Sequence, residues 1–245
     1  MDGEQNKITP KQLLSVPDGI FLLVGMVIGV GIFKAPSLVA GNTASGLEFM
    51  GAWLLGGLIS LCGALVYAEL ASRYPHTGGE YAFLSRGLGR SAAFLFAWSR
   101  MSVIQTGAIA AVAFVFGDYA PEIAPLGAHS SAKWAAICVI VLTGLNVAGT
   151  IESKTVQKLM EVVLITALVV LGLFGFFAGQ DVPQPAASAN PNASFGLAMI
   201  FVLLTYGGWN EAAYISGEVR DARRNMTRIL VVGIVAVTAR YMLVN

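Results

Sequence analysis

Charged residues are scarce in this chain of 245 residues. They make up 12% of it, against 56% hydrophobic residues, and the net charge is +1. Soluble globular proteins carry roughly 25% charged residues, so the composition argues against a soluble domain. Disordered and coiled-coil proteins need more charge, and nucleic-acid binding needs a basic patch that this chain lacks. The remaining class is a protein that dissolves in a lipid bilayer.

Cysteine and histidine are rarer still. Cys62 and Cys138 lie inside apolar runs, so neither a disulfide framework nor a cysteine-rich metal site is expected. His76 and His129 lie in polar connections, far apart in the sequence, and no HExxH, GxSxG or GxxxxGK[ST] motif occurs. We therefore expect no enzyme activity, no cofactor and no metal ion.

Long apolar stretches account for most of the chain. They cover about 16–40, 49–70, 91–117, 134–150, 160–179, 195–216 and 229–245. Most are long enough to cross about 30 Å of hydrocarbon as helices, which predicts an all-α polytopic membrane protein. The polar start of the chain and the long run after it do not fit a cleaved signal peptide. The last stretch ends abruptly at Asn245, which suggests a C-terminally truncated chain.

The connections between these stretches differ in positive charge. One set comprises residues 1–17, 72–90, 151–158 and 216–228, and the alternate set comprises 40–48, 118–133 and 180–194. The first set holds eleven lysine and arginine residues, and the second holds only Lys133. Positive charge gathers on the cytoplasmic side of membrane proteins. This asymmetry predicts a cytoplasmic N-terminus in an inner or plasma membrane.

Two of the apolar stretches are interrupted by glycine. The first contains GMVIGVGIFKAP at Gly25–Pro36, and the sixth contains TYGGWNE at Thr205–Glu211. Each glycine lowers helix stability by roughly 1 kcal/mol relative to alanine, although a single one in a membrane helix usually marks a packing surface. Two interruptions five spans apart instead indicate corresponding positions of an inverted repeat, with discontinuous helices around a central binding site.

A helix break in mid-membrane frees backbone groups that must face protein, water or a ligand. The half-helix that begins near Gly31 would present N–H groups and the positive end of its dipole, which suit a carboxylate. The half-helices that end near Ile28 and Gly207 would present carbonyls, which suit an ammonium group. Together these ends match a zwitterionic α-amino acid, and Tyr206 or Trp209 is a candidate for an apolar lid over it.

Three segments carry a family resemblance. They are GMVIGVGIFKAP at Gly25–Pro36, YAELASRYPHTGGEYAFLSRGLG at Tyr67–Gly89 and YGGWNEAAYISGEVRDARRN at Tyr206–Asn225. The chain resembles the amino acid–polyamine–organocation permeases, and within them the L-type amino acid transporter branch, over essentially its whole length. The resemblance implies a five-plus-five inverted-repeat fold, usually in a twelve-span chain. It also implies alternating access, in which spans 1 and 6 move against the rest.

The same resemblance implies a division of the chain. Residues 1–17 would form a cytoplasmic N-terminus, and residues 18–179 the first inverted repeat with spans 1–5. Residues 180–194 would form an extracellular or periplasmic loop, and residues 195–245 the incomplete start of the second repeat with spans 6 and 7.

The implied substrate site lies at the two breaks. Its residues are Val27, Ile28, Gly29, Val30, Gly31, Tyr206, Gly207, Gly208 and Asn210. The substrate carboxylate would meet the backbone of Gly29–Gly31. The amino group would meet carbonyls of Val27–Ile28 and Tyr206–Gly207. Asn210 lies where polar side chains line the site in the family.

Three departures from the family pattern bear on coupling and partners. Val30 replaces a serine of many relatives, which removes a hydroxyl contact but keeps the N–H group. Leu164 stands where many relatives have a lysine in place of a sodium ion, so exchange and coupling to H+ or Na+ stay open. The 118–133 loop has no cysteine, so we expect no disulfide-linked heavy chain.

Four further residues are gate or coupling candidates: Trp209, Glu211, Arg100 and Glu69. Ionisable residues within membrane spans are functional candidates by default, but structural pairing explains each of them as well. Two functional alternatives to an amino acid carrier stay open. One is a non-transporting amino acid sensor or receptor, and the other is a permease for a related cationic amine such as a polyamine.

Overall fold

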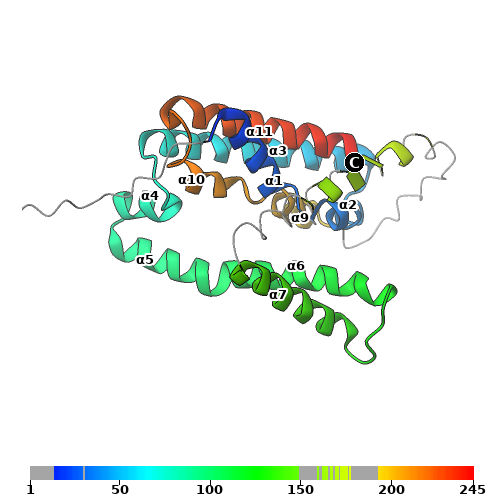
Figure 1. Ribbon diagram of the computed structural model, residues 1–245. Coiled ribbons are helices and arrows are strands. Elements are labelled where there is room, and N and C mark those ends of the chain that lie inside the picture. The colour runs from blue at the N-terminus through cyan, green and yellow to red at the C-terminus, as the bar shows by residue number, and fades with distance from the viewer. Residues whose placement is uncertain are drawn as a thin grey trace, which may run out of the picture. The chain divides into compact units, whose positions relative to one another are not determined.

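The computed structural model describes residues 14–29, 31–148 and 193–245, with scattered positions between 159 and 177 (Figure 1). Within these ranges the regular structure is helical, apart from one isolated bridge between Leu14 and Val219. The predicted fifth span, 160–179, is described only at scattered positions, and Val30 lies outside the described residues.

The described helices fall into two packing units. The described residues 14–90 and 193–245, without residue 30, form the first unit, and the described residues from 91 to 177 form the second. The first contains α1 (Val16–Val27), α2 (Gly31–Ala40), α3 (Gly46–Arg73), α4 (Gly79–Gly87), α9 (Phe195–Thr205), η4 (Trp209–Glu211), α10 (Ala212–Ile215) and α11 (Ala222–Val244). The second contains α5 (Arg90–Ser99), η1 (Arg100–Ile104), α6 (Gln105–Tyr119), η2 (Ala120–Glu122) and α7 (Ser130–Ala148). The predicted boundaries of the inverted repeat depend on the symmetry between its two copies and not on packing units, so they stay a prediction.

Four helical stretches among the described residues are long and apolar enough to cross a membrane. They are α3, the run Arg90–Glu122, Ser130–Val147 of α7, and α11. α1 and α2 form a pair bent by 53° that would together make a fifth span. These five match the predicted first, second, third, fourth and seventh stretches. The sixth stretch is divided into short helices, of which α9 has 11 residues.

Helix ends differ from the predicted ends where charged residues continue the helix. α11 begins at Ala222 rather than near residue 229, because Arg223, Arg224 and Arg228 form its first turns. Hydropathy locates only the apolar part of a helix, so it misses helical turns that extend into a polar environment. α3 begins at Gly46, where the hydroxyl of Ser45 caps the helix.

The start of α1 is held by both local and distant contacts. The side chains and backbones of Ser15 and Asp18 form a reciprocal capping box. The N–H of Leu14 donates to the carbonyl of Glu218, and the N–H of Arg220 donates to the carbonyl of Leu14, each at 3.0 Å. These bonds tie the start of the first span to the connection before α11.

The core of the first unit lies where α11 packs along α1 and α3, and Figure 1 shows α3 and α11 side by side. Glycines allow this close packing. A Cβ added at Gly57 of α3 would lie 2.5 Å from the hydroxyl of Thr238 in α11, and one at Gly233 of α11 would lie 2.5 Å from the side chain of Leu23 in α1. Small residues at such positions let membrane helices approach closely.

Gly57→Ala is therefore expected to push α3 away from α11. The new methyl group would overlap Thr238, so the free energy of unfolding should fall by about 1–3 kcal/mol. Gly51→Ala on the same helix is the control, because its Cβ would meet no heavy atom within 4 Å. Thermal unfolding of the two purified variants in detergent checks this, and equal unfolding temperatures would contradict the packing argument.

Candidate functional site

The first apolar stretch is interrupted where the glycine pattern predicts. α1 ends at Val27, and Ile28 turns to an extended conformation with φ −77° and ψ 99°. The N–H of Ile28 still donates to the carbonyl of Val24 at 2.8 Å. The helix restarts as α2 at Gly31, which confirms the predicted discontinuity of this span.

The sixth apolar stretch is also interrupted. α9 ends at Thr205, and the chain turns through Tyr206 and Gly207 before the short helices η4 and α10. Gly208 has a left-handed φ of +104°, a backbone conformation that residues other than glycine rarely adopt. This second discontinuity confirms the prediction made from the TYGGWNE segment.

The two breaks lie against each other. A Cβ on Gly208 would lie 2.5 Å from the carbonyl oxygen of Met26, and one on Gly31 would lie 3.4 Å from the side chain of Thr205. Glycine at position 208 is therefore required both by φ and by the approach of the α1 backbone. Residues about 180 positions apart in the sequence thus build one junction from the ends of α1, α2 and α9.

Space is open next to the first break. Gly29 is exposed, and a Cβ added there would meet no heavy atom of the described residues within 4 Å. Gly207 of the second break is exposed as well. The backbone at these two positions is accessible, whereas Ile28 is buried.

The carbonyl ends of α1 and α9 both receive a hydrogen bond from Tyr241 of α11. The Tyr241 hydroxyl lies 3.3 Å from the carbonyl oxygen of Val27 and 3.0 Å from that of Thr205. The carbonyl of Val27, which the sequence analysis assigned to a substrate amino group, therefore has a donor within the protein. Ile28, Tyr206 and Gly207 stay as the predicted carbonyl ligands.

The side chain of Tyr206 does not cover the break as a lid. It is fully buried, and its hydroxyl donates to the carbonyl of Trp53 at 3.1 Å. Its ring centroid lies 4.9 Å from that of Tyr241 and 6.4 Å from that of Trp53. The ring fills the core between α9, α3 and α11, because a tyrosine at the end of α9 can direct its side chain into the packed face.

The side chains that follow the second break turn toward a buried carboxylate. Glu80, in the first turn of α4, is 7% exposed. It accepts hydrogen bonds from the Tyr67 hydroxyl at 2.6 Å, from Nδ2 of Asn210 at 3.1 Å and from the Tyr214 hydroxyl at 3.2 Å. The Trp209 ring packs edge-on against Tyr67 with centroids 5.2 Å apart. We call these residues the Glu80 cluster.

The Glu80 cluster joins α3 and α4 to the segment after the second break. Hydrogen bonds to an ionised acceptor are about twice as strong as neutral ones, and a buried carboxylate needs such donors. The sequence pattern points to Asn210 and Trp209 but not to Glu80, Tyr67 or Tyr214. Glu80 lies in the second quoted segment, yet nothing in that segment shows that two of its partners lie in the third.

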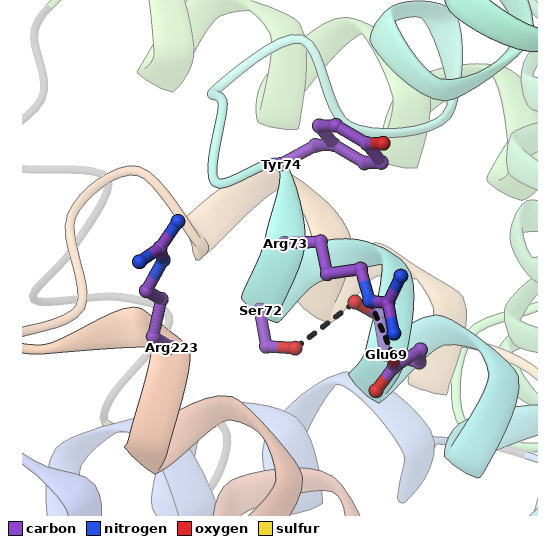
Figure 2. A pocket seen from close by; sticks show the side chains of 5 residues that line it. All are labelled: Glu69, Ser72, Arg73, Tyr74 and Arg223. Carbon is purple, nitrogen blue, oxygen red and sulfur yellow. Dashed lines mark hydrogen bonds and ion pairs between the residues drawn. The ribbon is translucent and has the colours of Figure 1, made fainter.

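Glu69 lies away from both breaks, near the end of α3. It forms an ion pair with Arg73, one turn later, and both side chains are more than half exposed. Figure 2 shows the pair at an open cleft of about 410 Å³ that Ser72, Tyr74 and Arg223 also line. No residue of either break lines this cleft.

The other two gate candidates have different surroundings. Glu211 is half-buried at the end of η4, directly after Asn210. Arg100 lies in the second packing unit, where it begins the π-helical segment η1 and its carbonyl accepts from the N–H of Gln105. Such π-turns often occur at functional sites.

Among the described residues, no group of three or more His, Cys, Asp or Glu side chains could hold a metal ion.

Apolar spanning helices and two interrupted spans that meet define a multi-pass membrane protein of the discontinuous-helix type. Residues 14–245 match a family model described as amino acid permease. The chain belongs to the amino acid permease family, and its resemblance to the L-type branch is confirmed by the relatives described next.

The relatives are amino acid transporters. The serine/threonine exchanger SteT of Bacillus subtilis is 29% identical over 246 residues, which cover 100% of this chain and 56% of that protein. The b(0,+)-type amino acid transporter 1 of Homo sapiens is 29% identical, with 100% and 53% covered. The human Asc-type amino acid transporter 1 is 27% identical, with 99% and 49% covered. The chain thus spans about half the length of these relatives, which are transporters and not enzymes.

Glu80→Gln should destabilise the first unit more than Glu69→Gln. The amide keeps the size of the side chain but removes the charge and places an NH2 donor among three donors, so we expect a loss of about 1–3 kcal/mol in unfolding free energy. Glu69→Gln removes only an exposed ion pair with Arg73 and should cost at most about 1 kcal/mol. Thermal unfolding in detergent compares the two, and equal losses would show that the cluster has no special weight.

Proposed function

We propose that this protein carries amino acids across the membrane by alternating access. The observation that supports this most is the meeting of the two helix breaks, with Gly208 against the backbone of Met26. The N-terminal end of α2 and the C-terminal ends of α1 and α9 come together at that junction. Opposite helix ends side by side provide donors and acceptors for a ligand that carries both charges.

The proposed ligand contacts use the backbone. The N–H groups at Gly29–Gly31, at the start of α2, would bind the substrate carboxylate. The carbonyls of Ile28, Tyr206 and Gly207 would bind its amino group. The open space beside Gly29 supports approach of a ligand to the main chain. Gly208 and Asn210 would line the site, with the amide of Asn210 donating to Glu80, and Trp209 would act as a gate residue against Tyr67.

We further propose that transport is an exchange of amino acids. The support is the description of one relative as a serine/threonine exchanger.

The N-terminus would be cytoplasmic, as the distribution of lysine and arginine predicts. Both cysteines, Cys62 and Cys138, are free, and the 118–133 loop has none, so no disulfide-linked heavy chain is proposed there.

Uptake of radiolabelled amino acids into proteoliposomes that contain the full protein tests this function. Uptake should rise when the vesicles are preloaded with unlabelled amino acid and should not require a Na+ or pH gradient. Gradient-dependent uptake without preloading would refute exchange but keep transport. Binding without flux would favour a sensor, and competition by polyamines alone would overturn the substrate class.

Gly29→Leu should abolish uptake while leaving membrane insertion intact. The leucine side chain would fill the open space from which the ligand reaches the backbone, so uptake should fall by more than about tenfold. Gly51→Leu is the matched control, since a Cβ at Gly51 on α3 also has no neighbour within 4 Å. Wild-type uptake by Gly29→Leu would remove the first break from the substrate site.

A further inference from the structure

An open cleft lies between the ends of two spanning helices, away from both helix breaks. It has a volume of about 410 Å³, and its lining residues are Glu69, Ser72, Arg73, Tyr74 and Arg223 (Figure 2). The first three belong to the end of α3, and Arg223 belongs to the first turn of α11. Both helices are long and apolar enough to cross a membrane.

The length of α3 places this cleft at the depth of lipid headgroups. α3 has 28 residues and is therefore about 42 Å long. A bilayer measures about 40–45 Å with its headgroup regions, of which only about 30 Å is hydrocarbon. A helix of this length reaches the headgroups at both ends, so Arg73, its last residue, lies at that level. Arg223 lines the same cleft and lies at the same level.

Positive charge exceeds negative charge around the cleft. Glu69 pairs with Nε of Arg73, and a guanidinium carries five N–H donors, so Arg73 keeps donors for a second acceptor. Among the described residues, no ion pair, hydrogen bond or ring contact holds the side chain of Arg223. The guanidinium of Arg86 lies over the Tyr74 ring, 4.7 Å from its centroid, and adds a third positive charge beside the cleft.

These donors match a phosphate group. Arginine binds phosphate oxygens through parallel N–H bonds, which a cation such as a polyamine cannot accept. Three arginines against the single carboxylate of Glu69 also disfavour a cation. Basic pockets between membrane helices bind anionic lipid headgroups, and this cleft has both the charge and the depth for one.

Apolar side chains continue from the cleft along the same face of α3. Residues three or four positions apart share a helix face, so Val66 and Leu65 lie one turn before Glu69 on its face. They are 60% and 46% exposed. Acyl chains beneath a bound headgroup would contact these side chains, whereas free phosphate would gain nothing from them. A phospholipid therefore fits the surface better than free phosphate does.

We propose that the cleft binds the phosphate headgroup of an anionic phospholipid. Arg223 and Arg73 donate to the phosphate, and Glu69 orients Arg73 through its Nε. The acyl chains lie along Leu65 and Val66. This inference does not rest on amino acid transport, because it requires only that α3 and α11 span a membrane.

Native mass spectrometry of the full protein in detergent measures this binding. The probes are dioleoylphosphatidylglycerol and dioleoylphosphatidylcholine, which have identical acyl chains and differ in headgroup charge. Two arginines near an anionic headgroup should favour the phosphatidylglycerol by at least about tenfold in affinity. Equal affinities for the two lipids would overturn the proposal.

Arg223→Gln should weaken the binding of phosphatidylglycerol about fivefold, because it removes one of the two cationic donors. Arg228→Gln is the matched control, since Arg228 is also an exposed arginine of α11 but does not line the cleft. Its affinity should stay within about twofold of the parent. Equal losses in the two variants would indicate attraction to the general basic surface and would overturn the site.

Thermal unfolding in detergent separates lost binding from a folding defect. Without added lipid, Arg223→Gln and the parent should unfold at the same temperature, because the Arg223 side chain has no partner among the described residues. Added phosphatidylglycerol should raise the unfolding temperature of the parent and of Arg228→Gln more than that of Arg223→Gln, since a ligand stabilises the state that binds it. An equal rise in all three proteins would contradict the proposal.

Inorganic phosphate distinguishes a lipid site from a phosphate site. It should not displace phosphatidylglycerol at equal concentration, because it lacks the acyl chains. Displacement at equal concentration would overturn a phospholipid as the occupant. Absence of amino acid transport would refute the proposed function but would leave these affinities unchanged, because none of the measurements uses an amino acid.

Discussion

The requirement that every backbone polar group be bonded inside a membrane governs the architecture of the first unit. In two spans a helix ends in the middle of an apolar stretch, which leaves backbone groups there without a partner in their own helix. The structure meets the requirement by bringing the breaks together, so that the ends of α1 and α9 share the hydroxyl of Tyr241. The same junction leaves the backbone around Gly29 accessible. The constraint that shapes the fold thus also creates the place where a ligand finds bare main chain.

Close approach of helices makes this solution possible. Gly208 admits the backbone of Met26, Gly57 of α3 admits the side chain of Thr238 of α11, and Gly233 of α11 admits that of Leu23 of α1. α11 can therefore lie deep enough between α1 and α3 for a tyrosine on it to reach both breaks. Glycine has no side-chain functional group. A larger residue at any of these positions would therefore affect the junction only by increasing the distance between the helices.

The sequence predicts the interruptions but not their partners. GMVIGVGIFKAP and TYGGWNE are local patterns, and glycine within an apolar run is visible without any structure. The bond of Tyr241 to Val27 and that of Asn210 to Glu80 join residues 214 and 130 positions apart, for which no local pattern exists. The direction of the Tyr206 ring depends on which face of α9 is packed, so a lid and a core residue look alike in sequence. The π-helical turn at Arg100 has no periodic signal either.

The sixth span is held on both sides of its break by different bonds. Before the break, the carbonyl of Thr205 is bonded to Tyr241 of α11, and after it the amide of Asn210 is bonded to Glu80 of α4. Only Tyr206 to Trp209 lie between these two anchors, and Gly208 is the residue with a left-handed φ among them. A movement of the later half relative to the earlier half must therefore change the dihedral angles of this short segment or break one anchor. Glycine changes its dihedral angles at the lowest steric cost, so the second break has the properties of a hinge between two fixed points.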